Sequence, residues 1–337
     1  MAMMLVRILF GLLPVLLFLA ALVYLDSYKL VRLRLVLGTL AAGAAAAALS
    51  YAINAGLSAE LAMEARAYSR YVAPLVEETL KAAAIVWLLR ARRIGFLVDA
   101  AILGFAVGAG FAVAENLWFL GSRPDSRLAV WIIRGLGTAI MHGGATAICA
   151  ILSRLLSERS SSPGIAVALP GLFGAVAVHS FFNHFFLSPV ASALAVLVVL
   201  PPLVTVVFRT SERSLREWLD VGFDADTELL ELIQSGELSE SRVGRYLQTL
   251  RGRFRGEILA DLLCYLRLRV ELSLRAKGLL LAREAGFRPT VSPEVRDLLD
   301  EMAYLERSIG RTGKLALSPF LRTSDQDLWQ LRLLGKG

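Results

Sequence analysis

Nine polar or ionisable residues lie inside segments that are otherwise strongly apolar. They are Glu77, Glu78, Lys81, Glu115, Asn116, His142, His179, Asn183 and His184. All three histidines of the chain belong to this set. Charged and strongly polar groups are costly inside a membrane, so each of these residues is a candidate for a functional role.

The residue types in this set are suited to the hydrolysis of a bond by water. A carboxylate that is screened from solvent can act as a general base toward a water molecule, and the N–H groups of histidine and asparagine can stabilise the oxyanion that forms. Glu77 and Lys81 are four residues apart, so they share one helix face and can form an ion pair. His179 and Asn183 share a face for the same reason, whereas Glu78 lies about 100° around the helix from Glu77.

Seven apolar segments carry these residues or flank the segments that do. Hydrophobic residues make up 56% of the 337 residues, and the mean hydropathy is +0.60, which is typical of an integral membrane protein. A membrane span needs about 20 predominantly apolar residues. The predicted spans are 4–25, 35–58, 71–89, 97–120, 130–152, 164–187 and 190–208.

The composition changes after residue 208. Residues 1–208 contain 15 Lys and Arg and 9 Asp and Glu, whereas residues 209–337 contain 21 and 20. The apolar residues of the second part recur at helical spacing, as in the segment 298–309. We therefore predict an all-α chain, with a polytopic membrane helix bundle at 1–208 that carries the chemistry. A soluble, cytoplasmic α-helical domain is predicted at 209–337, where it would bind an unknown cytoplasmic partner.

The basic residues of the loops predict the orientation in the membrane. One set of alternate loops contains Lys29, Arg32, Arg34, Arg90, Arg92, Arg93, Arg154, Arg159, Arg209, Arg213 and Arg216, and the other contains Arg66, Arg70, Arg123 and Arg127. Because Lys and Arg are enriched in cytoplasmic loops, the larger set is predicted to be cytoplasmic and the N-terminus to lie outside. Glu77, Glu115, His179 and Asn183 then fall in the outer half of the membrane. His142 lies near the middle, so side chains from four spans can meet at similar depth.

Other chemistries have less support. The net charge of +7 belongs mostly to the membrane part, where anionic lipid attracts basic loops, so nucleic acid is not an expected partner. Cys149 and Cys264 form no CxxC pattern, and the chain has no HExxH motif. Glutamate and two or three histidines could ligate zinc. We nevertheless expect no cofactor and favour catalysis without a metal ion.

Four short motifs follow one another, one in each of four predicted spans. They are "EETLK" at 77–81, "FAVAEN" at 111–116, "HGGATA" at 142–147 and "HSFFN" at 179–183. In this order they resemble the PrsW family of intramembrane proteases, which is related to the type II CAAX prenyl proteases. The resemblance covers about residues 71–187, and Asp99 is similar to the acidic residue that opens the second motif of this family.

The resemblance implies a glutamic-type peptidase that cuts single-span or otherwise membrane-anchored proteins within the lipid bilayer of a bacterial inner membrane. Glu77 would activate the water, and His179 with Asn183 would polarise the scissile carbonyl. The further candidate catalytic residues are Glu78, Glu115 and His142. The CAAX-type relatives carry a histidine where this chain has Glu115, which argues against prenylated substrates. One role in the family is the first cut of a membrane-bound anti-sigma factor, and the substrate of this chain is left open.

Two other functions are compatible with the same residues. A proton-coupled transporter also uses carboxylates and histidines inside a helix bundle, although the sequence shows no inverted repeat. A non-catalytic scaffold would bind single-span helices through small-residue faces such as "AAGAAAAALS" at 41–50.

Overall fold

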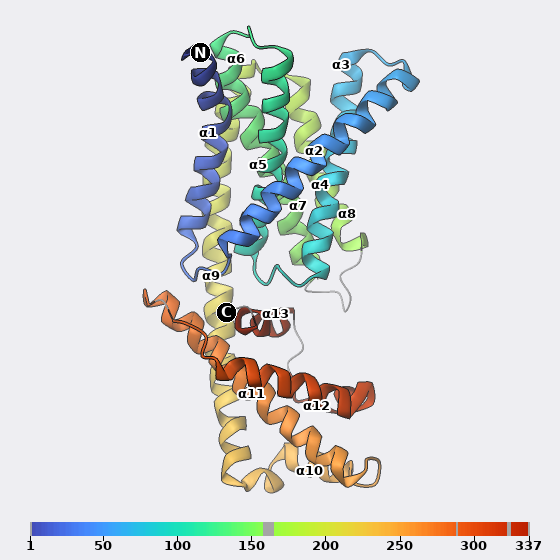
Figure 1. The fold of residues 1–337 in the computed structure, drawn as a ribbon, viewed down its shortest axis with the longest axis vertical. Helices are drawn as coiled ribbons and strands as arrows, with labels where there is room; N and C mark the ends of the chain where they lie inside the picture. Colours follow the sequence, from blue (N-terminus) through green and yellow to red (C-terminus); the bar gives the residue numbers. More distant parts are fainter. Residues whose placement is uncertain (1, 158–164, 288, 322–324, 336–337) are drawn as a thin grey trace. The chain divides into compact units, whose positions relative to one another are not determined.

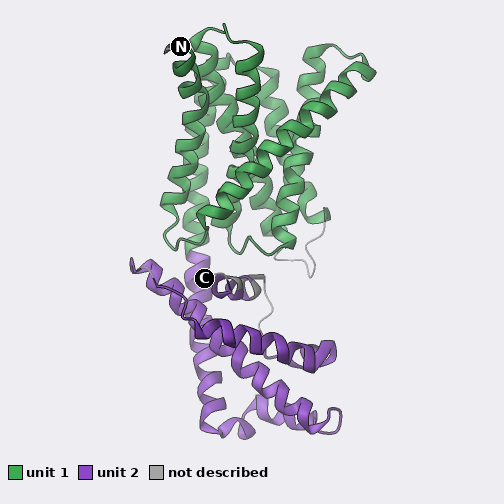
Figure 2. Cartoon of the chain, viewed as in Figure 1, with its two compact units in different colours: residues 1–212 green, residues 213–337 purple. Residues whose placement is uncertain are grey.

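The computed structural model describes residues 2–157, 165–287, 289–321 and 325–335. Within these ranges the chain is helical almost throughout and contains no strand, which confirms the predicted all-α class. The chain divides into two compact units, unit 1 at residues 1–212 and unit 2 at residues 213–337 (Figure 2). Arg159 and the predicted start of a span at residue 164 lie outside the described residues.

Unit 1 consists of long helices joined by short connections (Figure 1). Its elements are α1 (Ala2–Leu25), α2 (Leu33–Leu61), α3 (Ala65–Ala67), η1 (Tyr68–Val72), α4 (Ala73–Arg90), α5 (Leu97–Ser122), α6 (Leu128–Ile133), η2 (Arg134–Thr138), α7 (Ala139–Ser157), α8 (Ile165–His184) and the first part of α9 (Pro189–Ser235). η1 and η2 are π-helical turns that lead directly into α4 and α7. A π-turn therefore precedes each of two helices that carry candidate residues.

Six helices of the described chain are long and apolar enough to cross a membrane. They cover Met3–Leu25, Leu33–Leu61, Leu97–Ser122, Leu128–Ser157, Ile165–His184 and Pro189–Ser235. Each corresponds to one predicted span. The seventh predicted span, 71–89, corresponds to α4, which has 18 residues and is about 27 Å long. Its composition differs from that of the other six because it contains Glu77, Glu78 and Lys81.

The helix that carries the last predicted span extends beyond residue 208. α9 continues without a break from Pro189 to Ser235, past the predicted boundary at Arg209 and past the division between the units after Glu212. The segment after residue 208 contains good helix formers and no glycine or proline before Gly222, so the polarity of the helix changes while the backbone continues.

α5 is the most deeply buried helix of unit 1. It is buried continuously from Val98 to Ala112 and packs against α1, α2 and α7. Small residues permit this packing, because they let helix backbones approach closely. A side-chain carbon on Gly43 of α2 would overlap the carbonyl oxygen of Val107, and one on Gly110 of α5 would overlap the carbonyl oxygen of Leu40. The crossing of α2 and α5 is thus a backbone-to-backbone contact.

We predict that Gly43→Ala destabilises unit 1 by about 1–3 kcal/mol, because the added methyl group must push α2 away from α5. Gly38 lies on the same helix with nothing near the position of an added carbon, so Gly38→Ala is the matched control. Thermal unfolding of the full chain in detergent measures the difference. Equal unfolding temperatures for the two variants would contradict the close contact.

Unit 2 is a helical unit with its own apolar core. Its elements are the second part of α9, η3 (Glu237–Glu240), α10 (Arg242–Thr249), α11 (Gly256–Glu284), α12 (Glu294–Leu317) and α13 (Asp325–Leu334). Met302, Leu305 and Ile309 of α12 are buried, as the helical spacing of the segment 298–309 predicted, and Leu262 and Leu266 of α11 are buried as well. The backbone of α12 is non-helical at Gly310, where φ is 62°, and the helix resumes after this residue.

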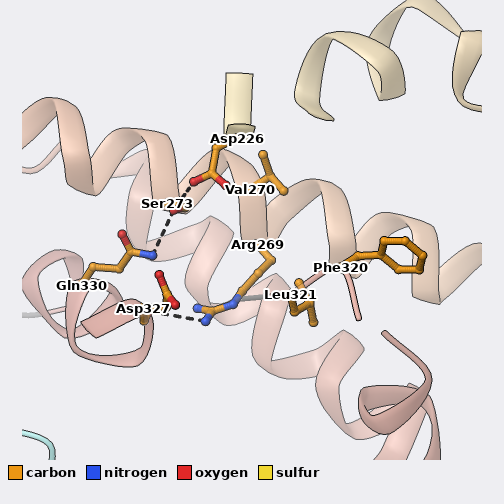
Figure 3. Close-up of a pocket in the computed structure, with 8 residues that line it drawn as sticks. All are labelled: Asp226, Arg269, Val270, Ser273, Phe320, Leu321, Asp327 and Gln330. Atoms are coloured by element: carbon orange, nitrogen blue, oxygen red, sulfur yellow. Dashed lines mark hydrogen bonds between the residues drawn. The ribbon is translucent and has the colours of Figure 1, made fainter. Parts of the chain in front are cut away.

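A polar network lies under α13 within unit 2 (Figure 3). Ser273 donates to Asp226 at 2.5 Å and accepts from Gln330 at 3.0 Å. Arg269 Nη1 and Gln330 Oε1 are buried and face a small pocket of about 20 Å³ beside Asp327. That volume suits a single water molecule between a donor and an acceptor rather than a metabolite. No histidine or cysteine lines the pocket, so we assign it a structural role.

Candidate active site

Four helices of unit 1 bring the predicted residues together near one end of each helix. Glu77 and Glu78 lie in the second turn of α4, Glu115 lies in the last two turns of α5, His142 lies in the first turn of α7, and His179 lies in the last two turns of α8. Their side chains form a connected set of contacts, described below. This set is called the α4–α8 cluster, and it consists of Glu77, Glu78, Lys81, Glu115, His142 and His179.

The buried part of the α4–α8 cluster is an ion pair with two histidines attached. Lys81 Nζ lies 2.5 Å from Glu78 Oε1, and both side chains have no exposed surface. Glu78 Oε1 also lies 2.8 Å from His179 Nδ1, and Lys81 Nζ lies 3.0 Å from His142 Nδ1. The ammonium group stands 4.3 Å from the centre of the Phe111 ring. The pair is thus surrounded by groups that compensate for its removal from water.

These contacts determine which nitrogen of each neutral imidazole carries the proton. An ammonium group only donates, so Nδ1 of His142 accepts from Lys81 and Nε2 carries the proton. That Nε2–H then donates to Glu115 Oε2 at 3.0 Å. A carboxylate only accepts, so His179 donates from Nδ1 to Glu78 and directs the lone pair of Nε2 toward Glu77. His179 Nε2 and Glu77 Oε2 are 3.9 Å apart.

The cluster has a closed side and an open side. The side chains of Glu78 and Lys81 are fully buried, whereas 18% of the Glu77 side chain and 37% of the Glu115 side chain are exposed. A substrate can therefore reach Glu77 and Glu115 without displacing the ion pair. The two histidines lie between the two sides, with ring centres 4.7 Å apart in an edge-to-face arrangement.

Arg134 is a member of the site that the sequence analysis missed. It is the first residue of η2, and its Nη2 lies 3.0 Å from Glu115 Oε1 while its Nε donates to Asn116 Oδ1 at 2.8 Å. Asn116 in turn donates to the carbonyl of Gly11 on α1 at 2.7 Å. An arginine inside a predicted span is an intramembrane cation, and that signal alone could have placed it among the candidates.

Asn183 contacts η1, the π-turn before α4, rather than the α4–α8 cluster. Its Nδ2 donates to the carbonyl of Ser69 at 2.9 Å, and Ser180 donates to the carbonyl of Arg70 at 2.6 Å. Pro74 explains both contacts, because it has no N–H for the carbonyls four and five residues earlier, which are those of Arg70 and Ser69. Two side chains of α8 therefore donate to carbonyls that receive no N–H from Pro74, and they fix η1, the turn that leads into α4.

The other two polar candidates have structural partners. His184 donates from Nδ1 to the carbonyl of Ser180 at 2.7 Å, so Nε2 of the neutral ring accepts from the hydroxyl of Tyr71 at 3.0 Å. Asp99 is buried at the start of α5, where it accepts from the N–H groups of Gly95 and Phe96 at 2.7 and 3.1 Å. It is sixteen residues, or about 24 Å, from Glu115 along the helix, so it acts as a cap.

We predict that Ser180→Ala lowers the free energy of unfolding by about 1 kcal/mol, because the Arg70 carbonyl loses its donor. In a Pro74→Ala background the same change should have a smaller effect, since the alanine supplies an N–H to that carbonyl. Thermal unfolding of the four proteins of this double-mutant cycle tests the coupling. An equal loss in both backgrounds would contradict our account of these contacts.

Three residues of the cluster could hold a metal ion. One ligand atom from each of Glu77, His142 and His179 lies within 4.8 Å of the others. Two imidazoles and a carboxylate are a donor set of catalytic zinc sites, and Glu78 on Nδ1 of His179 is the outer carboxylate that such ligands commonly have. Both nitrogens of His142 already have partners, Lys81 and Glu115. The residues therefore fit a metal ion provided that one of these contacts opens.

Residues 31–208 match the family described as PrsW family intramembrane metalloprotease. The chain belongs to the PrsW family. The match confirms the resemblance that the four motifs carry, and it includes all the helices that form the α4–α8 cluster. No curated protein and no solved structure matches the chain.

Family membership and the six long apolar helices make this PrsW-family chain an integral, multi-pass membrane protein. The family is one of intramembrane proteases, which supports peptidase activity toward a substrate embedded in the membrane. α1, which reaches the site through Gly11, precedes the matched residues.

Proposed function

We propose that this PrsW-family chain is a glutamic-type intramembrane endopeptidase whose water molecule is activated between Glu77 and His179. One observation carries the proposal. Glu77 Oε2 and His179 Nε2 are 3.9 Å apart on the accessible side of the cluster, and both atoms are acceptors when the imidazole is neutral. A group placed between two acceptors must donate, and a water molecule about to lose a proton is such a group.

The proposed reaction uses this pair as a base. The water gives a proton to Glu77, which passes it to Nε2 of His179, and the water oxygen attacks the carbonyl carbon of the scissile peptide. Once protonated, His179 donates from Nε2 toward the oxyanion, while Glu78 accepts from Nδ1 and compensates the positive charge. The carbon–nitrogen bond then breaks, and the same proton passes to the leaving amine.

Asn183, Glu115 and His142 complete the proposed set. An asparagine amide carries two N–H groups, and the contact with Ser69 uses one, so the other is available to the carbonyl of a substrate. Glu115 is exposed beside the site and contacts His142. We propose that this pair contributes to the wall against which the substrate backbone lies.

A metal ion held by Glu77, His142 and His179 would act as a Lewis acid on the carbonyl and would make a bound water more nucleophilic. We propose the metal-independent route because of Lys81. Its ammonium group donates to His142 Nδ1 at 3.0 Å, so the neutral ring carries its proton on Nε2 and has no free lone pair for a metal ion.

The location and the substrate belong to the same proposal. We propose a bacterial inner membrane, an outward-facing site and a cytoplasmic C-terminus, in line with the basic loops. The substrate would be a single-span or membrane-anchored protein, of which an anti-sigma factor is one example. The scaffold alternative loses support, because the small-residue face of α2 at Gly43 packs against α5 of the same chain.

We predict that Glu77→Gln lowers the rate of cleavage at least about 100-fold, since the amide cannot accept a proton from water. Glu64→Gln is the matched control, because Glu64 is an exposed carboxylate that precedes α3. Comparison of membrane and secreted peptides from cells that express each variant measures cleavage and identifies the substrate. The same fragments from Glu77→Gln and the unchanged chain would overturn the proposal.

We predict that cleavage persists after the purified chain is treated with phenanthroline, and that the chain carries less than one equivalent of transition metal. The treated chain is assayed on the substrate identified by the peptide comparison, and its metal content is measured by mass spectrometry. A loss of cleavage that added zinc restores, together with stoichiometric metal that His179→Gln removes, would instead assign the three residues as metal ligands.

A further inference from the structure

Arg134 holds three residues of α5 at once. Its guanidinium contacts Glu115 Oε1 at 3.0 Å and Asn116 Oδ1 at 2.8 Å, and it stacks 4.2 Å from the centre of the Phe119 ring. These partners lie on adjacent turns of one helix, so the planar fork of an arginine matches them and a lysine does not. Only 16% of the Arg134 side chain is exposed. The contacts of Arg134 are therefore part of the packed interior of unit 1 rather than those of a surface ion pair.

Glu115 relays this contact to His142. One carboxylate oxygen faces Arg134, and the other accepts from His142 Nε2 at 3.0 Å. A permanently charged guanidinium favours an ionised Glu115, and an ionised carboxylate can only accept. On the opposite side of the ring, Lys81 donates to Nδ1 at 3.0 Å. His142 is thus held between a donor and an acceptor, which permits one neutral tautomer and one ring orientation.

α1 supports the arrangement from outside the family-matched region. Asn116 donates to the carbonyl of Gly11 at 2.7 Å while it accepts from Arg134. η2 is pressed against the same helix, because a side-chain carbon on Gly135 would overlap the carbonyl oxygen of Phe10. The backbone that carries Arg134 is therefore fixed relative to α1, and so is the amide that orients its guanidinium.

We propose that Arg134 is a positioning residue of the peptidase site, which fixes the ring orientation of His142 through Glu115. This inference rests on the proposed function for its effect on cleavage, and on geometry alone for its effect on His142. Arg134 touches no reacting atom in this scheme.

The first test observes the imidazole directly. The chain has three histidines, so nitrogen NMR of the ¹⁵N-histidine-labelled full chain in detergent micelles should resolve each ring, and His142→Gln assigns the signals. We expect the Nε2–H tautomer for His142 in every variant, because Lys81 donates to Nδ1. The Nε2–H signal should shift and broaden in Arg134→Gln, because Glu115 is no longer held against it, and it should return partly in Arg134→Lys. The His184 signals, which report the Tyr71 contact, should stay unchanged and show that the fold persists.

Arg127→Gln removes an exposed arginine seven residues earlier and is the matched control for charge. It should leave all three histidines unchanged. An unaltered His142 Nε2–H signal in Arg134→Gln would overturn the proposal. Equal disturbance of His142 by Arg127→Gln would also overturn it, because the effect would then follow net charge rather than the contact.

The second test measures turnover of a fluorogenic single-span peptide whose sequence is taken from the fragment that requires Glu77. We expect Arg134→Gln to lower kcat about 10- to 100-fold with KM changed less than about twofold, and Arg134→Lys to recover part of the loss. A purely structural role would instead reduce the amount of folded enzyme without changing kcat per folded molecule. If the proposed function fails, no fragment requires Glu77, whereas the NMR result still decides whether Arg134 positions His142.

Discussion

The site depends on the ion pair between Glu78 and Lys81. Both side chains are fully buried, and each also contacts one histidine. Glu78 contacts His179, and Lys81 contacts His142. Loss of one partner from a buried pair typically destabilises a protein by about 3–5 kcal/mol, because it leaves an uncompensated charge. The pair therefore does more than neutralise two charges inside an apolar bundle. It places the two imidazoles edge to face and determines which nitrogen of each ring is left for other partners.

The packing of the apolar bundle brings polar side chains from four helices within hydrogen-bond distance of one another. α5 is buried along most of its length, and glycines on α2 and α5 let the backbones touch. Polar contacts then fix the positions of individual helix turns, which apolar packing alone does not determine. Ser180 and Asn183 hold η1, the turn that leads into α4, where Pro74 removes a donor, and Arg134 holds the last turns of α5.

The sequence predicted most of the fold and most of the cluster, for identifiable reasons. Six spans follow from long apolar runs, and the charged residues of α4, with the histidines of α7 and α8, stand out because such groups are rare in membranes. Arg134 was missed because it lies near the start of the predicted span 130–152. It was therefore counted neither among the arginines of the loops nor among the polar residues inside the spans. The contact of Asn183 with Ser69 also could not be predicted, because helical spacing says which residues share a face and says nothing of a π-turn before α4. The continuation of α9 past residue 208 was missed because hydropathy marks a change of solvent rather than the end of a helix.

The order of contacts in the cluster has a consequence for where protons can travel. From the exposed Glu115 the contacts run through His142, Lys81 and Glu78 to His179, each within 3.0 Å of the next. The step from His179 to the partly exposed Glu77 is 3.9 Å. A water molecule at that step would complete a proton wire with two ends open to the surroundings. In that case a hydrolysed bond need not leave a net charge in the apolar interior, because a proton taken up at one end can be balanced by a proton released at the other.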